Sequence, residues 1–284
     1  MRNVHAQDTV FTNGLYGRIK QLTEYSNSEG GDNGVEAGER AHKVTTLFDE
    51  EGNRTEELRY GHDGMLISRL VFKYSPSGKL AEERNYNESG KYLYSNIYRY
   101  DTRGNEIIRK NYKAGKELFL KVSMTYDDHN NVIEELTQSP GGRTLSKAIW
   151  RYDTANNPVA EITFDADEGV TRNSVYVYDA HGHLIEDKST YYGIMLRTTY
   201  AYDSTGNIVE ECSYNAEGVP DKKIRYSYND RGHETQQLIY SASGDLQKTI
   251  TLRNDYDARG NMVKKVQVDG GKETIVMVRA IVYY

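Results

Sequence analysis

The chain has 284 residues, a formal net charge of -6 and an isoelectric point near 5.7, and 25 of its residues are tyrosines. An acidic chain without a basic stripe is not a general nucleic-acid binder, and its single Cys212 excludes an intrachain disulfide or a Cys-rich zinc module. No apolar run reaches the roughly 20 residues of a membrane helix. Because aliphatic residues are few, tyrosine must supply much of the buried surface of a folded chain.

The first 14 residues precede the repetitive part of the chain, and we expect residues 1–14 to be a frayed N-terminal segment. The sequence His5-Ala6-Gln7-Asp8 also fits the trailing edge of a removed signal peptide, and the sequence leaves both readings open. From there on we expect one domain, residues 15–284, with a loop insertion at about 27–42 where Gly, Glu, Asn and Asp accumulate.

Aromatic residues recur along this domain at a nearly fixed interval. We call them the main anchors: Phe48, Tyr74, Tyr100, Tyr126, Tyr152, Tyr178, Tyr202, Tyr228, Tyr256 and Tyr284. Their spacing is 26 residues as far as Tyr178 and 24 to 28 residues beyond it. Such a period is typical of stacked copies of one small structural unit.

Each 26-residue unit divides again, because secondary anchors stand 12 residues after the main ones: Tyr60, Tyr86, Tyr112, Phe164, Tyr214 and Tyr240. Turn sequences with Asx or Ser and then Gly follow both kinds of anchor, so each half-repeat is expected to be one strand and one hairpin loop. The prediction is an all-β fold, a long antiparallel meander of about 18–20 strands. With no helix to cover an apolar face, the sheet should curl into a spiral, a shell or a rolled sheet.

The spacings are all even, and even spacing along strands keeps side chains on one face. A structural aromatic ladder is therefore expected on that face: Phe72, Tyr74, Tyr98, Tyr100, Tyr126, Trp150, Tyr152, Tyr176, Tyr178, Tyr200, Tyr202, Tyr226 and Tyr228. The residues between them, such as Arg99 and Arg151, are expected to face water.

The turns have the form Tyr-Asp-x-x-Gly-Asn at residues 100–105 and 202–207, with close variants at residues 178–183, 228–233 and 256–261. The chain from Leu15 to Tyr284 thus resembles the YD-repeat family, also called RHS repeats, of bacterial polymorphic toxins, insecticidal toxin complexes and teneurins. The resemblance implies a strand-turn-strand spiral that forms hollow shells in large members. The chain lacks their Asp-Pro-x-x-Gly junction and a toxic domain, so we expect a stand-alone repeat protein.

An acidic column is the most distinctive candidate site. By even spacing, five glutamates should share the face of the tyrosines: Glu56, Glu82, Glu134, Glu186 and Glu210. Their neighbours, such as Glu57 and Glu211, should point away. One hypothesis is an acidic lining that binds cations or sugar hydroxyls, and the other is that each carboxylate accepts hydrogen bonds within the fold, since an unpaired buried carboxylate is costly.

The remaining chemistry-bearing residues favour structural roles. The turn aspartates fit Asx-turn capping rather than a calcium loop. His181 and His183 lie in a loop, where solvated imidazoles are ordinary, and metal chelation is the alternative for this pair. Cys212 should be a small buried residue on the inward face. We expect no metal, no cofactor and no enzymatic activity; a glycoside hydrolase is the enzymatic alternative, because paired carboxylates are common on this chain.

The sequence thus favours a non-enzymatic repeat scaffold, secreted or held in a bacterial cell envelope, which binds carbohydrate or another protein through loops and sheet edges. The alternative is a toxin-associated RHS shell module or partner, which would pair with another protein through its exposed first or last strand.

Overall fold

The structure is a computed structural model that describes residues 15–26 and 42–284. The predicted N-terminal segment and nearly all of the loop insertion at about 27–42 lie outside the described residues. Twenty β-strands and no helix are found in the described part, which confirms the all-β prediction and its strand number. No helix there is long and apolar enough to cross a membrane. The chain divides into two compact units, Met1–Ser95 with Ile250–Tyr284 (unit 1) and Asn96–Thr249 (unit 2).

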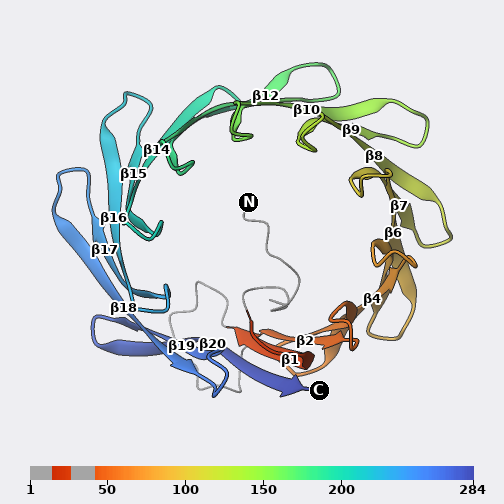
Figure 1. Ribbon diagram of the computed structural model, residues 1–284, viewed down its shortest axis with the longest axis horizontal. Coiled ribbons are helices and arrows are strands. Elements are labelled where there is room, and N and C mark those ends of the chain that lie inside the picture. The colour runs from red at the N-terminus through yellow and green to blue at the C-terminus, as the bar shows by residue number, and fades with distance from the viewer. Residues whose placement is uncertain (1–14, 27–41) are drawn as a thin grey trace. The chain divides into compact units, whose positions relative to one another are not determined.

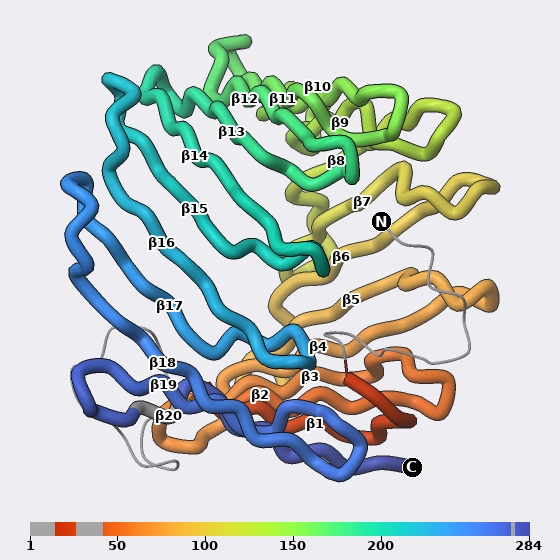
Figure 2. The backbone as a smooth tube through the Cα atoms, turned by 60° about the vertical axis from the view of Figure 1, so that its left-hand side comes forward, coloured from red at the N-terminus to blue at the C-terminus, as the bar shows by residue number. Residues whose placement is uncertain are grey.

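Unit 2 is an antiparallel meander in which each strand pairs with the next one along the chain. Its strands are β7 (Glu106–Lys113), β8 (Leu118–Tyr126), β9 (Val132–Gln138), β10 (Thr144–Tyr152), β11 (Pro158–Phe164), β12 (Val170–Tyr178), β13 (Leu184–Tyr191), β14 (Ile194–Tyr202), β15 (Ile208–Tyr214), β16 (Pro220–Tyr228) and β17 (Glu234–Tyr240). Figure 1 shows that these strands follow one another along an arc, so the predicted curling is present within this unit. Figure 2 shows β14 to β17 side by side in chain order.

Unit 1 contains both ends of the described chain. Its strands are β1 (Ile19–Ser26), β2 (His42–Phe48), β3 (Arg54–Tyr60), β4 (Leu66–Tyr74), β5 (Leu80–Asn87), β19 (Met262–Asp269) and β20 (Lys272–Tyr283). Two more strands, β6 (Tyr92–Tyr100) and β18 (Leu246–Tyr256), have residues in both units. The pairing order here is β18, β19, β20, β1, β2, β3, β4, β5.

The first and last described strands are therefore neighbours. β1 pairs with β20 on one side and with β2 on the other, and Leu22 lies opposite Ile281. β20 in turn pairs with β19. The prediction that the first or last strand offers an exposed edge is wrong, because the backbone groups of each are satisfied by two neighbouring strands.

An aliphatic cluster packs at this junction. Leu15, Ile19, Leu22 and Phe48 are all buried, and Ile281 and Tyr283 pack against them. Four of the buried apolar side chains thus gather where the first and last described strands meet.

Most hairpins share one loop geometry. After Tyr152, for example, the N–H of Asn156 donates to the carbonyl of Asp153 and the N–H of Asp153 donates to the carbonyl of Asn157. Asn156 has a φ of 65°, the left-handed conformation that Gly adopts in most of the equivalent turns. We call these turns, which follow the main anchors, the main-anchor turns.

A β-bulge next to each of these loops changes the face on which residues lie. Tyr152 pairs with Pro158, but Arg151 pairs with Ala160, so Val159 is an extra residue. Residues directly opposite each other share a face of the sheet, and the extra residue moves every later side chain of that strand to the other face. Even spacing along the chain therefore does not preserve the face across a hairpin, contrary to the sequence-based argument.

The hairpin between β13 and β14 has no bulge, yet the ladder residues of β14 still lie on the same face as those of β12. It has a two-residue turn, Tyr192 and Gly193, both with positive φ (45° and 82°), and Tyr191 pairs directly with Ile194 without a bulge. This is the place where the sequence repeat is two residues short. Loss of the longer loop together with its bulge keeps the faces in register with the rest of the unit.

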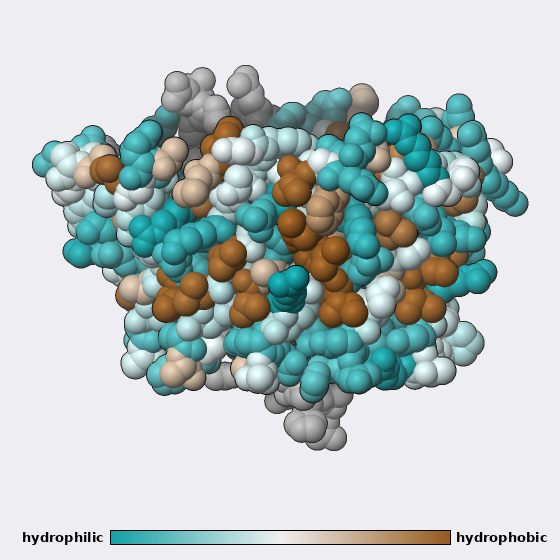
Figure 3. All heavy atoms as spheres, turned by 90° about the horizontal axis from the view of Figure 1, so that it is seen from above, coloured by the Kyte–Doolittle hydropathy of each residue, from teal (hydrophilic) through white to brown (hydrophobic). Residues whose placement is uncertain are grey.

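The sheet has two faces: the anchor face carries the residues of the aromatic ladder, and the opposite face carries the residues between them. On β12 the opposite face exposes Val175 and Val177, which are 49% and 40% exposed. Figure 3, from the side that is uppermost in Figure 1, shows apolar side chains in separate patches among hydrophilic ones. This side of the molecule is thus a mixture of both kinds rather than uniformly polar.

Candidate functional site

The main-anchor turns present ordered carboxylates. In the turn after Tyr126, Asp127 Oδ1 accepts hydrogen bonds from the backbone N–H of His129 (2.9 Å) and of Asn131 (2.8 Å). Asp127 Oδ2 accepts one from the side-chain amide of Asn131 (2.9 Å). These bonds, that from the Asn131 side chain foremost, lower the pKa of Asp127. The carboxylate is thus ionised at neutral pH and keeps one acceptor position on Oδ2.

Successive main-anchor turns also bind each other. The side-chain amide of Asn105 donates to Asn130 Oδ1 of the next turn (2.8 Å), and that of Asn131 donates to Asn156 Oδ1 (3.0 Å). Asn105 and Asn131 each bond both to the Asp of their own turn and to the residue with positive φ in the next main-anchor turn. The turns form a ladder of polar groups at one end of the strands.

Two grooves lie between neighbouring main-anchor turns of unit 2. The first, of about 570 Å³, is lined among others by Asp127, Ile133, Trp150, Tyr152 and Asp153. The second, of about 530 Å³, is lined among others by Asp203, Val209, Tyr226, Tyr228 and Asn229. The two sets occupy equivalent positions in their repeats, so the groove is a property of the repeat itself. A hollow of about 470 Å³ in unit 1, around Gly61 and Met65, belongs to a secondary-anchor turn.

Each groove combines a half-buried aromatic ring with turn carboxylates or amides. Trp150 stands in the first and Tyr226 in the second, both on the anchor face. An aromatic ring can stack on the apolar face of a sugar or another ring, while the turn side chains accept or donate hydrogen bonds. The grooves are thus suited to a ligand with one apolar face and polar edges.

The main anchors themselves bind the neighbouring repeat. Tyr152 donates from its hydroxyl to the carbonyl of Val132 (2.8 Å), at the start of β9. The same bond recurs from Tyr74, Tyr126, Tyr178, Tyr202 and Tyr228 to the carbonyls of Arg54, Glu106, Pro158, Leu184 and Ile208, at 2.7 to 3.0 Å. Burial raises the pKa of Tyr152. These rings therefore join adjacent strands as well as filling space.

The five glutamates proposed from the sequence do not lie on the anchor face. Glu134, for example, lies opposite Thr125 and Ile149 on the opposite face, because of the bulge beside the main anchor. All five are in ion pairs with basic residues of the same or a neighbouring strand: Glu56 with Arg69, Glu82 with Lys73 and Arg84, Glu134 with Lys147, Glu186 with Lys188 and Arg197, and Glu210 with Lys223 and Arg225. The predicted face is wrong, and the five are separated along the sheet rather than gathered in one site.

The anchor face instead carries the acidic residue one position later. Glu57, Glu83, Glu135, Asp187 and Glu211, which the sequence placed outward, lie there with Glu161. Tyr226 donates to Glu211 Oε2 (3.3 Å), and Tyr176 donates to Glu161 Oε2 (3.0 Å). Burial, with a further contribution from Glu211, raises the pKa of Tyr226. Cross-strand pairing, had the bulge been foreseen, would have identified this column.

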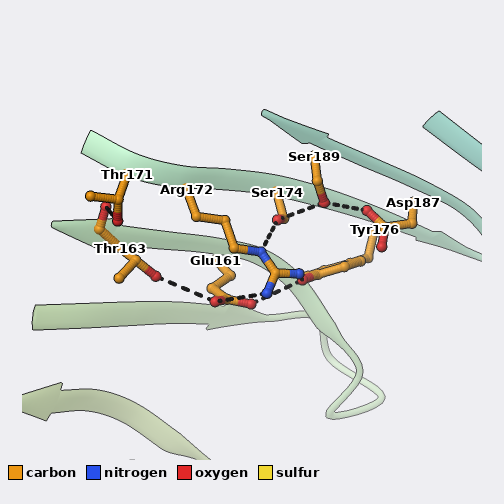
Figure 4. Close-up of polar contacts among 8 residues, drawn as sticks. All are labelled: Glu161, Thr163, Thr171, Arg172, Ser174, Tyr176, Asp187 and Ser189. Carbon is orange, nitrogen blue, oxygen red and sulfur yellow. Dashed lines mark hydrogen bonds and ion pairs between the residues drawn. The ribbon is translucent and has the colours of Figure 1, made fainter. Parts of the chain in front are cut away.

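A polar network, mostly half-buried, interrupts the aromatic face on β11, β12 and β13. Figure 4 shows its members: Glu161, Thr163, Thr171, Arg172, Ser174, Tyr176, Asp187 and Ser189. Ser174 is fully buried and contacts Arg172 Nε (2.9 Å) and Ser189 Oγ (2.8 Å), and Ser189 donates to Asp187 (2.6 Å). Since these groups satisfy one another, the network supports the sheet and has the character of a polar core.

Two residues considered from the sequence have different surroundings from those expected. Cys212 is buried, but it lies on the opposite face, across from Thr199 and Lys223, and not on the inward face with the ladder. His183 lies in a main-anchor turn with Asp179 and His181, and one potential ligand atom from each lies within 4.8 Å of the others. Sequence spacing suggested the histidine pair but did not show that the capping aspartate lies beside both rings.

Comparison with known families gives a partial match. A family described as "Uncharacterised protein" matches residues 45–147, less than half of the chain. That description does not mention YD repeats, so the match does not show that the chain belongs to the YD-repeat family. No curated protein matches the chain.

Three solved structures to which the chain is similar are distant from it. A chain of the structure of TcdB2-TccC3-Cdc42 is 12% identical with a TM-score of 0.36, over 95% of this chain and 16% of that chain. A porin-like protein from Bacteroides uniformis is 12% identical with a TM-score of 0.40, over 93% and 96% of the two chains. A chain of the Photorhabdus luminescens Tc holotoxin pore is 13% identical with a TM-score of 0.31, over 90% and 16%. This chain thus spans about a sixth of the toxin chains, and similarities this weak carry no argument about its family or function.

Proposed function

We propose that the protein is a non-enzymatic repeat scaffold that binds carbohydrate in the grooves between neighbouring main-anchor turns. The observation that carries the proposal is the repetition of one groove at equivalent positions, around Trp150 and around Tyr226. A catalytic centre requires one distinctive place, whereas a binding surface for a polymer benefits from several similar ones.

The chemistry of the grooves favours a sugar over other small ligands. Trp150 lines the first groove together with Asp127 and Asp153, whose ionised carboxylates are oriented by hydrogen bonds within their turns. Hydrogen bonds from the backbone and side chain of Asn157 lower the pKa of Asp153. Oriented acceptors beside an aromatic ring match the hydroxyls and the apolar face of a pyranose.

The proposed location, secreted or in a bacterial envelope, rests on the resemblance of the turns to YD repeats and remains an expectation. The route proposed for a protein partner, through the first or last strand, is not available, since β1 and β20 pair with each other. Loops and grooves remain as the binding surface, and protein is the other ligand class that a test must separate from carbohydrate.

A glycan array screened with the purified chain, followed by titration of any hit, tests the proposal. We expect saturable binding that raises the melting temperature. Trp150→Ala and Tyr226→Ala should each weaken binding by about three- to tenfold, the value of one stacked ring. Phe119→Ala is the control, because Phe119 is 46% exposed and is not part of either groove.

Asp153→Asn gives a second variant that keeps the fold, because Asn229 naturally occupies the equivalent position. It should weaken sugar binding, and it should lower the melting temperature only slightly, because Oδ1 keeps its backbone donors and only the bond from the Asn157 side-chain amide is lost. An array without any saturable hit, or a hit that survives both aromatic substitutions, would refute the proposed groove.

A further inference from the structure

One main-anchor turn of unit 2 differs chemically from the others. In the turns that end at Asn105, Asn131, Asn157 and Asn207, the last residue is an asparagine whose amide donates to the first Asp. In the turn 179–183 a histidine stands in that place, and a second histidine, His181, stands two residues before it. Two imidazoles and a carboxylate therefore meet in one turn.

The carboxylate of this turn is fixed with one oxygen turned to both rings. Asp179 Oδ1 accepts hydrogen bonds from the backbone N–H of His181 (2.8 Å) and of His183 (2.9 Å). Asp179 Oδ2 lies 3.0 Å from His183 Nδ1 and 3.8 Å from His181 Nδ1. Backbone donors thus play the orienting part that outer hydrogen bonds play in metal sites.

Two of the three separations are close to those of ligands around one small cation. With metal–ligand bonds of about 2.0–2.1 Å in a tetrahedral arrangement, two ligand atoms lie about 3.4 Å apart. The distances from Asp179 Oδ2 to His183 Nδ1 (3.0 Å) and to His181 Nδ1 (3.8 Å) lie on either side of this value. His181 is 81% exposed, so its ring can turn to close the third side of the set.

The orientation of His183 leaves Nδ1 as its available ligand atom. Its ring stacks on Tyr202, with centroids 4.7 Å apart and planes at 19°. A Cβ atom added to Gly206 would come within 3.2 Å of His183 Nε2, so that nitrogen faces the next turn. The ring is thus held edge-on with Nδ1 toward Asp179.

We propose that Asp179, His181 and His183 bind a divalent first-row transition-metal ion such as Zn²⁺, with water or a further ligand in the remaining positions. Imidazole and carboxylate ligands suit this class of ion. The alternative is a purely structural role, in which His183 replaces the capping asparagine. It explains the contact of His183 with Asp179 but not the presence of His181 beside the same carboxylate. The site is independent of the proposed carbohydrate binding.

The chain contains its own controls. The turn 229–233 also ends in histidine, His233, but has Asn229 and Arg231 in place of the Asp and the first His. The turn 127–131 has a single His129 at the position of His181 and ends in an asparagine. Neither provides two imidazoles and a carboxylate, so His233→Asn and His129→Ala should leave metal binding unchanged.

The test is calorimetric titration of the full-length, metal-free and untagged chain with Zn²⁺. We expect one site per chain, with binding weakened by at least about tenfold in His181→Ala and in His183→Asn. His183→Asn restores the residue found in the neighbouring turns, so its melting temperature without metal should match the wild type, while the rise in melting temperature on adding Zn²⁺ should disappear. A wild-type chain that does not bind Zn²⁺, or binding that both variants retain at full strength, would overturn the assignment.

Discussion

The two units are stabilised in different ways. Among the described residues eleven apolar side chains are buried, nine of them in unit 1 and two, Val122 and Cys212, in unit 2. In unit 1 the first and last described strands meet around Ile19 and Phe48. Unit 2 instead relies on half-buried tyrosines, each bonded to a carbonyl of the preceding repeat, and on bonds between turns.

The difference follows from what a repeat can provide. Within unit 2 each strand contacts the next in the same way, so one aromatic residue and one capped turn per repeat suffice. The junction of β1 and β20 joins segments about 260 residues apart in sequence, and closing so large a loop requires strong contacts in return. The repeats are therefore held by many similar polar contacts, and the junction by a compact apolar core.

High pH should produce the largest difference in stability between the two units, because it ionises many tyrosines at once. Burial raises the pKa of nine tyrosines in unit 2, namely Tyr100, Tyr126, Tyr152, Tyr176, Tyr178, Tyr200, Tyr202, Tyr226 and Tyr228, and in unit 1 it raises that of Tyr283. A raised pKa contributes stability that is complete below the unfolded value, about 10, and is lost as the pH rises through the folded value. We expect unit 2 to unfold first in this range.

Tyrosine absorbance and circular dichroism, followed together against pH, measure this effect, and hydrogen exchange locates it. Ionisation and unfolding should coincide above about pH 10, with the exchange beginning in unit 2. If the tyrosines ionise near pH 10 while the sheet remains intact, the rings are not the stabilising elements described here.

The sequence showed the repeat but not the faces of the sheet. Tyrosine periodicity predicted strand number, hairpin positions and turn capping, since each depends on residues close together in the chain. Glu134 was predicted on the wrong face because of the bulge at Val132 to Ile133, beside Tyr126. This bulge is set by backbone pairing, and no particular residue type marks it in the sequence. The pairing of β1 with β20 was also missed, because no local pattern marks contacts between distant segments.

The grooves show the same limit. The sequence identified Trp150 and the turn aspartates, but as separate ladder and cap residues. Only the stacking of one turn on the next brings Asp127 and Asp153 together with Trp150 in the lining of one groove. In the same way it noted His181 and His183 but could not show how Asp179 is oriented between them.

A substitution in the apolar junction should have the largest effect of any single change. Ile19 is 1% exposed and packs with Leu15, Leu22 and Phe48. Ile19→Ala removes buried methyl groups and leaves a cavity, which should lower the free energy of unfolding by about 2–5 kcal/mol. Denaturant titration measures it, and Ile67→Ala is the matched control, since Ile67 is 54% exposed and should change stability by less than about 1 kcal/mol. Equal losses in the two variants would contradict a core at the junction.

The next largest difference in stability should be between substitutions of equivalent asparagines in the two units. Asn261 is 1% exposed and bonds both to the backbone of Tyr16 and to the hydroxyl of Tyr283. Asn131 is only half-buried, and its bond to the next turn is exposed. Asn261→Ala should cost about 2–3 kcal/mol, because it leaves buried polar groups without partners. Asn131→Ala should cost about 0.5 kcal/mol, because water replaces its contacts. Thermal unfolding of both variants compares them directly, and a reversed order would mean that the turn ladder, not the junction, limits stability.

The smallest effect should come from a single hydroxyl in unit 2, and it tests whether the anchors act by packing alone. Tyr152→Phe keeps the ring and removes the donor to the carbonyl of Val132. We expect a loss of about 1 kcal/mol, the net value of one hydrogen bond whose acceptor becomes half-buried and unpaired. Tyr192→Phe serves as the control, since Tyr192 is 65% exposed at a hairpin tip and should show no measurable change. Because the same bond recurs at five other described main anchors, a Tyr152→Phe variant as stable as the wild type would mean that the repeats are joined by ring packing, and that the hydroxyls serve another purpose.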